Sequence, residues 1–178
     1  MENNSKEHSD SIRTESIQWD STWPALAEPG EREFLLEYLE NRFGIGQNQF
    51  NDFLFFRKKK SWWICTEGPL FASVCRLRIS RIGMKAFQQV GQFLKPTTRF
   101  IQLFGSWATK STLVVSESEL LRLQQGEVLY PDLELAQGYV ILKLDEARII
   151  GLGLYVNGRV RSQLSTKALR VAMLEGDE

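Results

Sequence analysis

The residues best suited to binding chemistry are lysines and arginines that stand in long stretches without a carboxylate. Residues 68–116 contain no Asp or Glu, although charged residues make up 25% of the chain, and residues 147–174 form a second such stretch. Lys and Arg neutralise phosphates, so blocks of one charge sign indicate a polyanion as partner. An ordinary solvated face is the alternative explanation of the same pattern.

We predict that the cations of the two stretches form one RNA-binding surface. Its residues are Arg76, Arg78, Arg81, Lys85, Lys95, Arg99 and Lys110 from the first stretch and Arg159, Arg161, Lys167 and Arg170 from the second. Residues 57–60 add four adjacent cations beside Trp62 and Trp63, and exposed aromatic rings can stack on unpaired bases. For Trp63, which precedes Ile64, we expect instead a core or half-buried position in a strand.

The usual catalytic patterns are missing from the sequence. His8 is the only histidine, which argues against Ser-His-Asp and Cys-His mechanisms and against His-based zinc sites. Cys65 and Cys75 do not have zinc-site spacing, and Gly151 and Gly153 lack the third glycine and the helix of a nucleotide fingerprint. We therefore expect no catalysis by this chain, no cofactor and no metal.

The composition favours a cytoplasmic protein without a membrane partner. No run approaches the roughly 18 apolar residues of a transmembrane helix, and no apolar leader opens the sequence. Two cysteines do not make a disulfide framework, so both are expected to be buried thiols in a reducing compartment.

The elements that would position the second group of cations are three consecutive strands. Apolar runs at 139–144 and 149–156, followed by alternation at 159–164, predict these strands. Asn157-Gly158 predicts a type I′ hairpin turn between the last two, because that turn needs positive φ at both central residues.

This turn fixes which side chains share a face of the last strand. Arg159 and Arg161 are expected on one face and Val160 on the other. Gly151 and Gly153 in the middle strand predict a bulge or the close approach of another backbone.

The first part of the chain predicts a helix and a hairpin. Residues 31–43 have apolar side chains at helical spacing, and Gly44 ends the helix; the apolar stripe consists of Phe34, Leu35, Tyr38, Leu39 and Phe43. Residues 50–56 and 62–66 predict a hairpin with the cations 57–60 at its tip.

Further elements follow along the chain. Residues 76–84 predict a strand, and a short helix is expected to begin near Pro96 and to end at Gly105. A strand at 111–115 precedes a second helix capped by Ser116, with Leu120, Leu121 and Leu123 facing the core. After residue 164 we expect a basic turn at 165–170 and a last strand at 171–174.

The expected fold class is α+β. Residues 1–28 are polar and lack periodicity, which predicts a disordered acidic arm, although Trp19 and Trp23 could pack onto the domain. Residues 29–105 predict a small α/β unit, and residues 106–174 predict a β-rich unit with one helix.

The end of the sequence resembles a known RNA-binding module. Residues 151–155, 157–164 and 167–170 are similar to the end of the PUA-like module that closes Sun-family rRNA cytosine-5 methyltransferases. Ser165-Thr166 and Ala168 stand where that family has a proline and a glycine. Residues 95–98 and 103–105 resemble stand-alone archaeal proteins with a pre-PUA domain before a PUA-like one, an order also found in Nip-type ribosome-biogenesis factors.

The resemblance implies a pre-PUA unit at 29–105 and a PUA-like pseudo-barrel of mixed strands at 106–174. It also implies binding to structured rRNA or tRNA in rRNA maturation or modification, together with ribosomal or rRNA-modifying proteins. The family's methyltransferase core is missing, since no cofactor-binding glycine loop and no Pro-Cys motif occurs, so a separate enzyme would make any modification.

Two alternatives involve the N-terminal arm. Residues 1–40 hold ten acidic and three basic residues, although the formal net charge of the chain is zero. The protein could be a protein-interaction adaptor in ribosome biogenesis, with the arm recruiting a basic partner. The arm could also fold back onto the basic surface and compete with RNA.

Overall fold

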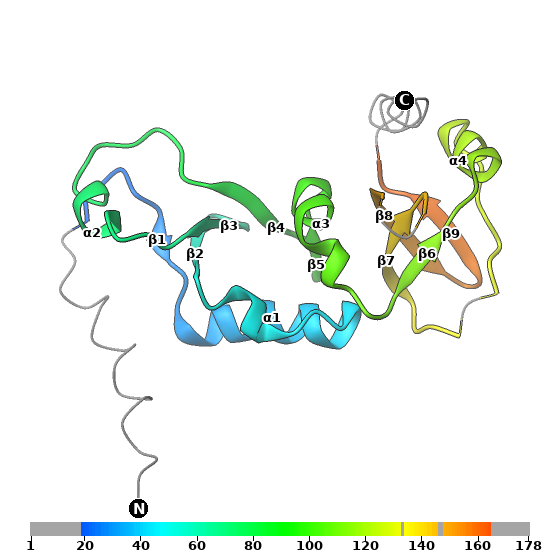
Figure 1. The fold of residues 1–178 in the computed structure, drawn as a ribbon, viewed down its shortest axis with the longest axis horizontal. Helices are drawn as coiled ribbons and strands as arrows, with labels where there is room; N and C mark the ends of the chain where they lie inside the picture. Colours follow the sequence, from blue (N-terminus) through cyan, green and yellow to red (C-terminus); the bar gives the residue numbers. More distant parts are fainter. Residues whose placement is uncertain (1–18, 133, 146–147, 165–178) are drawn as a thin grey trace, which may run out of the picture.

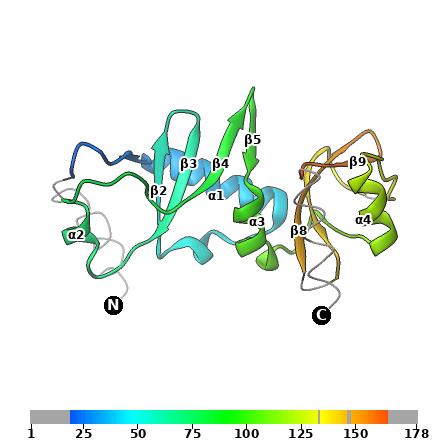
Figure 2. The same ribbon diagram turned by 90° about the horizontal axis from the view of Figure 1, so that it is seen from above.

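The computed structural model describes residues 19–132, 134–145 and 148–164 (Figure 1). The fold is mixed α/β, with a five-stranded sheet of order β1-β2-β3-β4-β5 and a four-stranded sheet of order β6-β7-β8-β9. Helix α3 (Thr98–Phe104) lies between the two sheets in both views (Figures 1 and 2). Within the described residues the second sheet is open, with β6 and β9 at its edges, and no closed barrel forms.

The first sheet is antiparallel throughout. Its strands are β1 (Ala25–Leu26), β2 (Phe53–Lys58), β3 (Ser61–Thr66), β4 (Met84–Val90) and β5 (Phe93–Pro96). β2 and β3 form the expected hairpin, and Lys59, in its turn, has a φ of 57°.

Helix α1 (Pro29–Phe43) covers one face of this sheet, which we call the inner face. Gly44 ends the helix with a φ of 67°, as predicted. The helix buries Leu35, Leu36, Leu39 and Phe43 in a cluster with inner-face residues of the sheet. The prediction for Phe34 was wrong: its side chain is 55% exposed, because the buried stripe is centred on Leu35 and Leu39 and takes in Leu36 instead.

The opposite face of the first sheet, the outer face, is covered in part by residues 19–28. The ring of Trp19 lies 5.7 Å from that of Phe56 and 5.6 Å from that of Phe71. Trp23 Nε1 donates a hydrogen bond to the Leu77 oxygen (2.8 Å), and β1 pairs with β2. Residues 19–28 are therefore part of the folded unit and not of a disordered arm, whereas residues 1–18 lie outside the described residues.

Residues 76–83 do not form the expected strand. Helix α2 (Phe71–Val74) is followed by turns and bends, and strand β4 begins only at Met84. A hairpin between β4 and β5 turns at Gly91, which has a φ of 60°, and was not predicted. The Thr97 hydroxyl caps α3, which ends at Gly105 as expected.

Two short 3-10 helices and α4 complete the helical elements among the described residues. They are η1 (Gln47–Phe50), η2 (Gly105–Trp107) and α4 (Glu117–Gln124). Ser116 and Glu119 form the capping box of α4, and Leu120 and Leu123 are buried as predicted. Leu121, also expected in the core, is 43% exposed because it lies on the other side of the helix.

The second sheet contains the three strands predicted at the C-terminal end. β6 (Thr112–Val114) runs parallel to β7 (Gly138–Lys143), and β8 (Ile149–Val156) and β9 (Arg159–Ser162) continue antiparallel. Asn157 and Gly158 have φ angles of 51° and 73°, which confirms the turn prediction. The elements expected at 165–174 lie outside the described residues.

The glycines of β8 lie where other side chains approach closely. The register of β7 and β8 shifts between Leu142 and Lys143, next to Gly151, so the predicted irregularity is present. A Cβ atom on Gly151 would lie 2.7 Å from Leu164 Cδ2 and 3.0 Å from Thr98 Cγ2. The chain after β9 therefore packs beside the start of α3.

One hydrophobic cluster joins the first sheet to part of the second, and another lies between the second sheet and α4. Ile141 of β7 and Leu152 of β8 belong to the same buried cluster as the side chains of α1 and α3. Gln102 Nε2 donates to the Ile150 oxygen (3.1 Å), and Arg42 Nε donates to the Tyr139 oxygen (2.6 Å). In the described part of the chain, no helix has the length and apolar character needed to cross a membrane.

Candidate nucleic-acid interface

A cavity of about 600 Å³ opens on the outer face of the first sheet. Its basic side chains come from separate segments: Lys58 at the end of β2, Arg81 in the loop 75–83, Lys85 in β4 and Arg99 in the first turn of α3. No Asp or Glu belongs to its lining within the described residues. We call this site the basic cavity.

Strand alternation selects which side chains of β3 and β4 enter the cavity. Trp62 is 6% exposed and points into the core with α1, so its neighbour Trp63 is on the outer face, half-buried. The register between β3 and β4 shifts at this point, which makes Lys85 the partner of Trp63. The bulge thus sets an aromatic ring and a cation side by side in the wall of the cavity.

The rest of the lining includes the apolar side chains of Ile79 and Ile82 in the loop 75–83. The loop is anchored at Ile79, whose backbone N–H donates to Thr22 Oγ1 at 2.9 Å. Met84 also belongs to the lining, but its side chain packs against the inner-face cluster. The basic cavity therefore combines cationic and apolar side chains.

A line of polar contacts leads from the basic cavity to the second sheet. Lys85 Nζ donates to Gln88 Oε1 (2.9 Å), and Gln88 is the register partner of Lys95. Lys95 Nζ donates to Gln163 Oε1 (3.0 Å) and lies 5.8 Å from the centre of the Tyr139 ring. Burial raises the pKa of Tyr139, so its hydroxyl stays protonated and neutral beside the lysine.

The arginines of β9 lie on the face of the second sheet that carries Tyr139. Tyr139, Leu154 and Arg161 are successive register partners across β7, β8 and β9, so their side chains share one face of the second sheet. Arg159 lies on the same face, with its guanidinium 5.7 Å from the centre of the Tyr130 ring. We use the term basic surface for the basic cavity together with Lys95, Arg161 and Arg159.

The cations of the basic surface are not paired with carboxylates among the described residues. The ion pairs there join Arg57 to Glu31, Arg122 to Glu127 and Arg148 to Asp145. Arg159 and Arg161 are exposed, and Val160 between them is buried, as the turn predicted.

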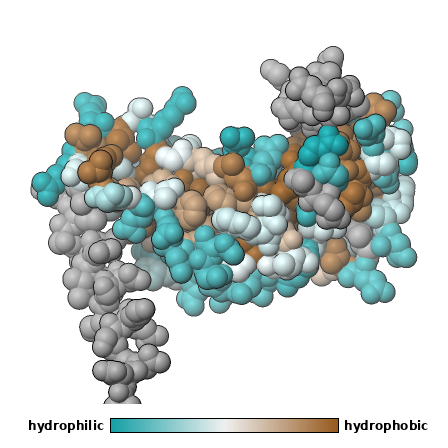
Figure 3. All heavy atoms as spheres, in the orientation of Figure 1, coloured by the Kyte–Doolittle hydropathy of each residue, from teal (hydrophilic) through white to brown (hydrophobic). Residues whose placement is uncertain are grey.

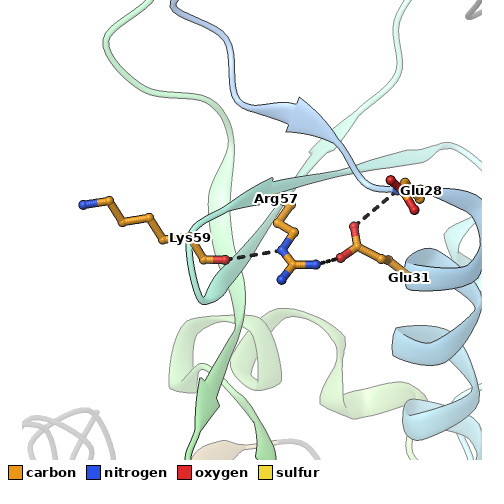
Figure 4. A network of polar contacts seen from close by, with 4 residues as sticks. All are labelled: Glu28, Glu31, Arg57 and Lys59. Carbon is orange, nitrogen blue, oxygen red and sulfur yellow. Dashed lines mark hydrogen bonds and ion pairs between the residues drawn. The ribbon is translucent and has the colours of Figure 1, made fainter.

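Arg57 and Lys58 of the β2–β3 hairpin have different roles. Figure 4 shows Arg57 turned toward α1, where its guanidinium pairs with Glu31 and donates to the Lys59 oxygen (3.4 Å). Arg57 also lies 5.5 Å from the centre of the Trp62 ring. The Lys59 side chain points away from this network (Figure 4). Arg57 therefore contributes to structure, and Lys58 is the cation of this hairpin that reaches the basic cavity.

Not all predicted site residues come together. Arg76 and Arg78 are exposed on the loop that follows α2, where the charge of Arg78 acts on Asp20. The pKa of Asp20 is lowered chiefly by hydrogen bonds from Thr22, and Arg78 adds a smaller effect in the same direction. Lys110 is exposed, and its backbone N–H donates to Phe43 at the end of α1, away from the cavity lining.

Four residues named in the sequence prediction remain to be placed. Lys167 and Arg170 lie outside the described residues, just beyond Leu164. Lys58, one of the cations 57–60 noted in the sequence, and Trp63, which is half-buried as expected, both line the basic cavity. The alternation of strand side chains explains their position. Lys58 is two residues after Phe56 in β2, and Trp63 is the register partner of Phe56 in β3, so all three side chains lie on the outer face.

The inner side of the first sheet carries the opposite charge. The exposed charged residues of α1 are Glu33, Glu37 and Glu40. The two arginines of α1 turn inward instead, and Arg32 Nη2 donates to the Phe50 oxygen (3.0 Å). Figure 3 shows hydrophilic side chains gathered along the lower edge of the molecule, over α1.

The chain was compared with protein-family models and with curated proteins. No model of a protein family matches the chain, and no curated protein matches it either. The arrangement of the basic surface therefore carries the functional argument.

Proposed function

We propose that the protein binds RNA through the basic surface, without catalysis of its own. The observation that carries the proposal is the convergence of Lys58, Arg81, Lys85 and Arg99 on one cavity whose described lining has no carboxylate. Cations held close together repel one another, so such a cluster is favourable when phosphates neutralise it. Lys95, Arg161 and Arg159 would extend the contact along a strand.

The proposal includes the biological setting implied by the sequence resemblance. The RNA would be rRNA or tRNA, bound in the cytoplasm during rRNA maturation or modification, with a separate enzyme supplying any chemistry. We also propose that residues 106–174 are a PUA-like unit. The mixed parallel and antiparallel pairing of β6 to β9 and the single helix α4 support this assignment.

A salt titration tests the proposal directly. Fluorescence polarisation with a labelled single-stranded RNA should give an affinity that falls linearly on a log-log plot against salt. The double variant Arg81→Glu/Arg99→Glu should weaken binding at least about tenfold and reduce the slope by more than about 1, since each lost phosphate contact removes about 0.7.

The matched control is Arg76→Glu/Lys110→Glu, which changes the net charge equally at two exposed sites outside the basic surface. This control should retain most of the affinity. A salt-independent affinity, or equal losses in both double variants, would contradict the proposal.

A protein-interaction adaptor is the second candidate, favoured by exposed apolar side chains around α2. Leu70 is 72% exposed and Leu77 is 60% exposed, and Val74 lies between them at helical spacing. Exposed apolar clusters of this kind mark protein contacts.

The adaptor hypothesis can be separated from RNA binding by truncation. A chain that begins at Trp19 keeps the aromatic contacts of the outer face, whereas removal of residues 1–28 would also delete β1. If the truncated chain loses capture of purified ribosomal proteins and keeps its RNA affinity, the adaptor role is supported. Unchanged capture would assign no partner to the acidic segment.

A further inference from the structure

The interior of the basic cavity has a composition that phosphate binding alone does not require. Trp63, Ile79 and Ile82 form an apolar wall beside its cations. A phosphate backbone that only crosses the surface would contact the cations and leave this wall bare. The wall therefore points to a ligand with an apolar, planar part as well as negative charge.

The cavity is large enough to hold one nucleotide. Its volume of about 600 Å³ lies within the range of about 300–1,000 Å³ found for small-molecule sites. Trp63 is half-buried at its edge, next to Lys85 in register. An aromatic ring beside cations is the arrangement on which proteins stack unpaired bases.

We propose that the basic cavity receives one unstacked nucleotide of an RNA strand, with its base against Trp63. The phosphates on either side lie at Arg81, Arg99 and Lys58, and the strand continues along Lys85 and Lys95. This inference rests on the proposed RNA binding and names its substrate class: RNA with an unpaired nucleotide. A continuous duplex cannot present a base in this way, because its bases are stacked and paired.

The experiment compares a labelled single-stranded RNA of about twelve nucleotides with a duplex of the same sequence, at one fixed salt concentration. The wild-type protein should bind the single strand more tightly. Trp63→Leu should weaken single-strand binding about 10- to 100-fold, the loss expected for one stacked base. The same variant should change duplex binding less than about threefold, because a paired base does not reach the wall.

Trp63→Phe is the matched control, because it keeps an aromatic face at the same position. It should retain single-strand affinity within about threefold. Equal losses for Trp63→Leu and Trp63→Phe would overturn the inference, and so would equal affinity of the wild-type protein for strand and duplex.

A measurement on the unmodified protein covers the case in which Trp63→Leu does not fold. Photocrosslinking of a strand that contains 5-bromouridine should label the peptide around Trp63. Crosslinks found only in other peptides would overturn the inference.

The outcomes separate this inference from the proposed function. Salt-dependent binding of both RNAs without dependence on Trp63 would remove the nucleotide site and leave RNA binding intact. If neither RNA binds, both the nucleotide site and the proposed function are rejected. Free AMP, used as a competitor, should not displace the strand at equimolar concentration, and displacement at that level would overturn the strand assignment in favour of a free nucleotide.

Discussion

At the scale of single residues, the arginines divide by what their guanidinium groups contact. Arg42 donates to the Tyr139 oxygen at 2.6 Å and to the Ala136 oxygen at 2.8 Å, which joins α1 to the start of β7. Its Nη2 atom is buried without a hydrogen-bond partner among the described residues, and burial lowers its pKa. Arg42 is thus a structural cation, unlike the exposed Arg81 or Arg99.

The first prediction concerns this arginine. Arg42→Lys should lower the free energy of unfolding by about 1–3 kcal/mol, because one ammonium cannot reproduce the forked contacts to two carbonyl oxygens. Chemical denaturation with urea measures the change.

Arg122→Lys provides the comparison, since Arg122 forms an exposed ion pair with Glu127. Its effect should not exceed about 0.5 kcal/mol. Equal effects of the two variants would show that the Arg42 contacts add nothing beyond a surface pair.

At the scale of elements, the loop 75–83 determines whether the basic cavity exists. It carries Arg81 and Ile79 over the outer face, and it ends at Gly83, directly before β4. Gly83 has a φ of +45°, and a Cβ atom there would lie 2.0 Å from the Ile64 oxygen. The close approach of Gly83 to β3 therefore fixes the height of the loop above the sheet.

The second prediction tests this approach. Gly83→Ala should destabilise the protein by more than about 2 kcal/mol, because the clash with the backbone adds to the roughly 1 kcal/mol expected for positive φ. Gly91→Ala shares the positive φ but has open space around it, so it should cost only about 1 kcal/mol. Thermal unfolding of both variants measures the difference, and indistinguishable values would contradict the packing argument.

The elements also show what the sequence could and could not predict. Local signals were sufficient for the Asn157-Gly158 turn and the Ser116 cap, because each depends on a few adjacent residues. The prediction of a strand at 76–84 was wrong. Basic and apolar residues alternate at the start of this segment, but distant contacts such as the hydrogen bond from Trp23 to Leu77 hold it as a loop. Tertiary contacts outweigh a weak alternation.

The site was predictable only in part for a related reason. A stretch without acids identified Arg81, Lys85 and Arg99, which do meet in one cavity. It could not exclude Arg76 or Lys110, because charge content does not show to which face a side chain points. For Trp63 and Lys85 that face is set by the register of β3 and β4, whose bulge cannot be predicted from local sequence.

At the scale of the whole molecule, one of the two buried clusters joins the two sheets. Ile141 and Leu152 of the second sheet are fully buried in the cluster that contains α1 and α3. Removing either sheet would expose apolar surface on the other. The second sheet also has a buried cluster of its own with α4, which includes Leu120, Val140 and Val160.

The third prediction is a single cooperative unfolding transition. All five tryptophans stand at or before residue 107, so tryptophan fluorescence reports on the first part of the chain, whereas far-UV circular dichroism reports on both sheets. The two probes should give coincident curves. Ile141→Ala should lower the free energy of unfolding reported by each probe by about 2–5 kcal/mol.

A second transition seen by circular dichroism alone would contradict the joining of the two sheets by the shared cluster. So would an Ile141→Ala variant that leaves the fluorescence transition in place. Either result would mean that the second sheet unfolds independently of the first.

The two sides of the first sheet carry opposite charge, with the glutamates of α1 on one side and the basic cavity on the other. Although its formal net charge is zero, the protein therefore has a permanent dipole across the sheet. Near an anionic polymer it experiences a torque that turns the cationic side forward before contact, within about 10 Å at 0.1 M ionic strength. Added salt should therefore slow the encounter itself, which composition alone would not lead one to expect of a neutral protein.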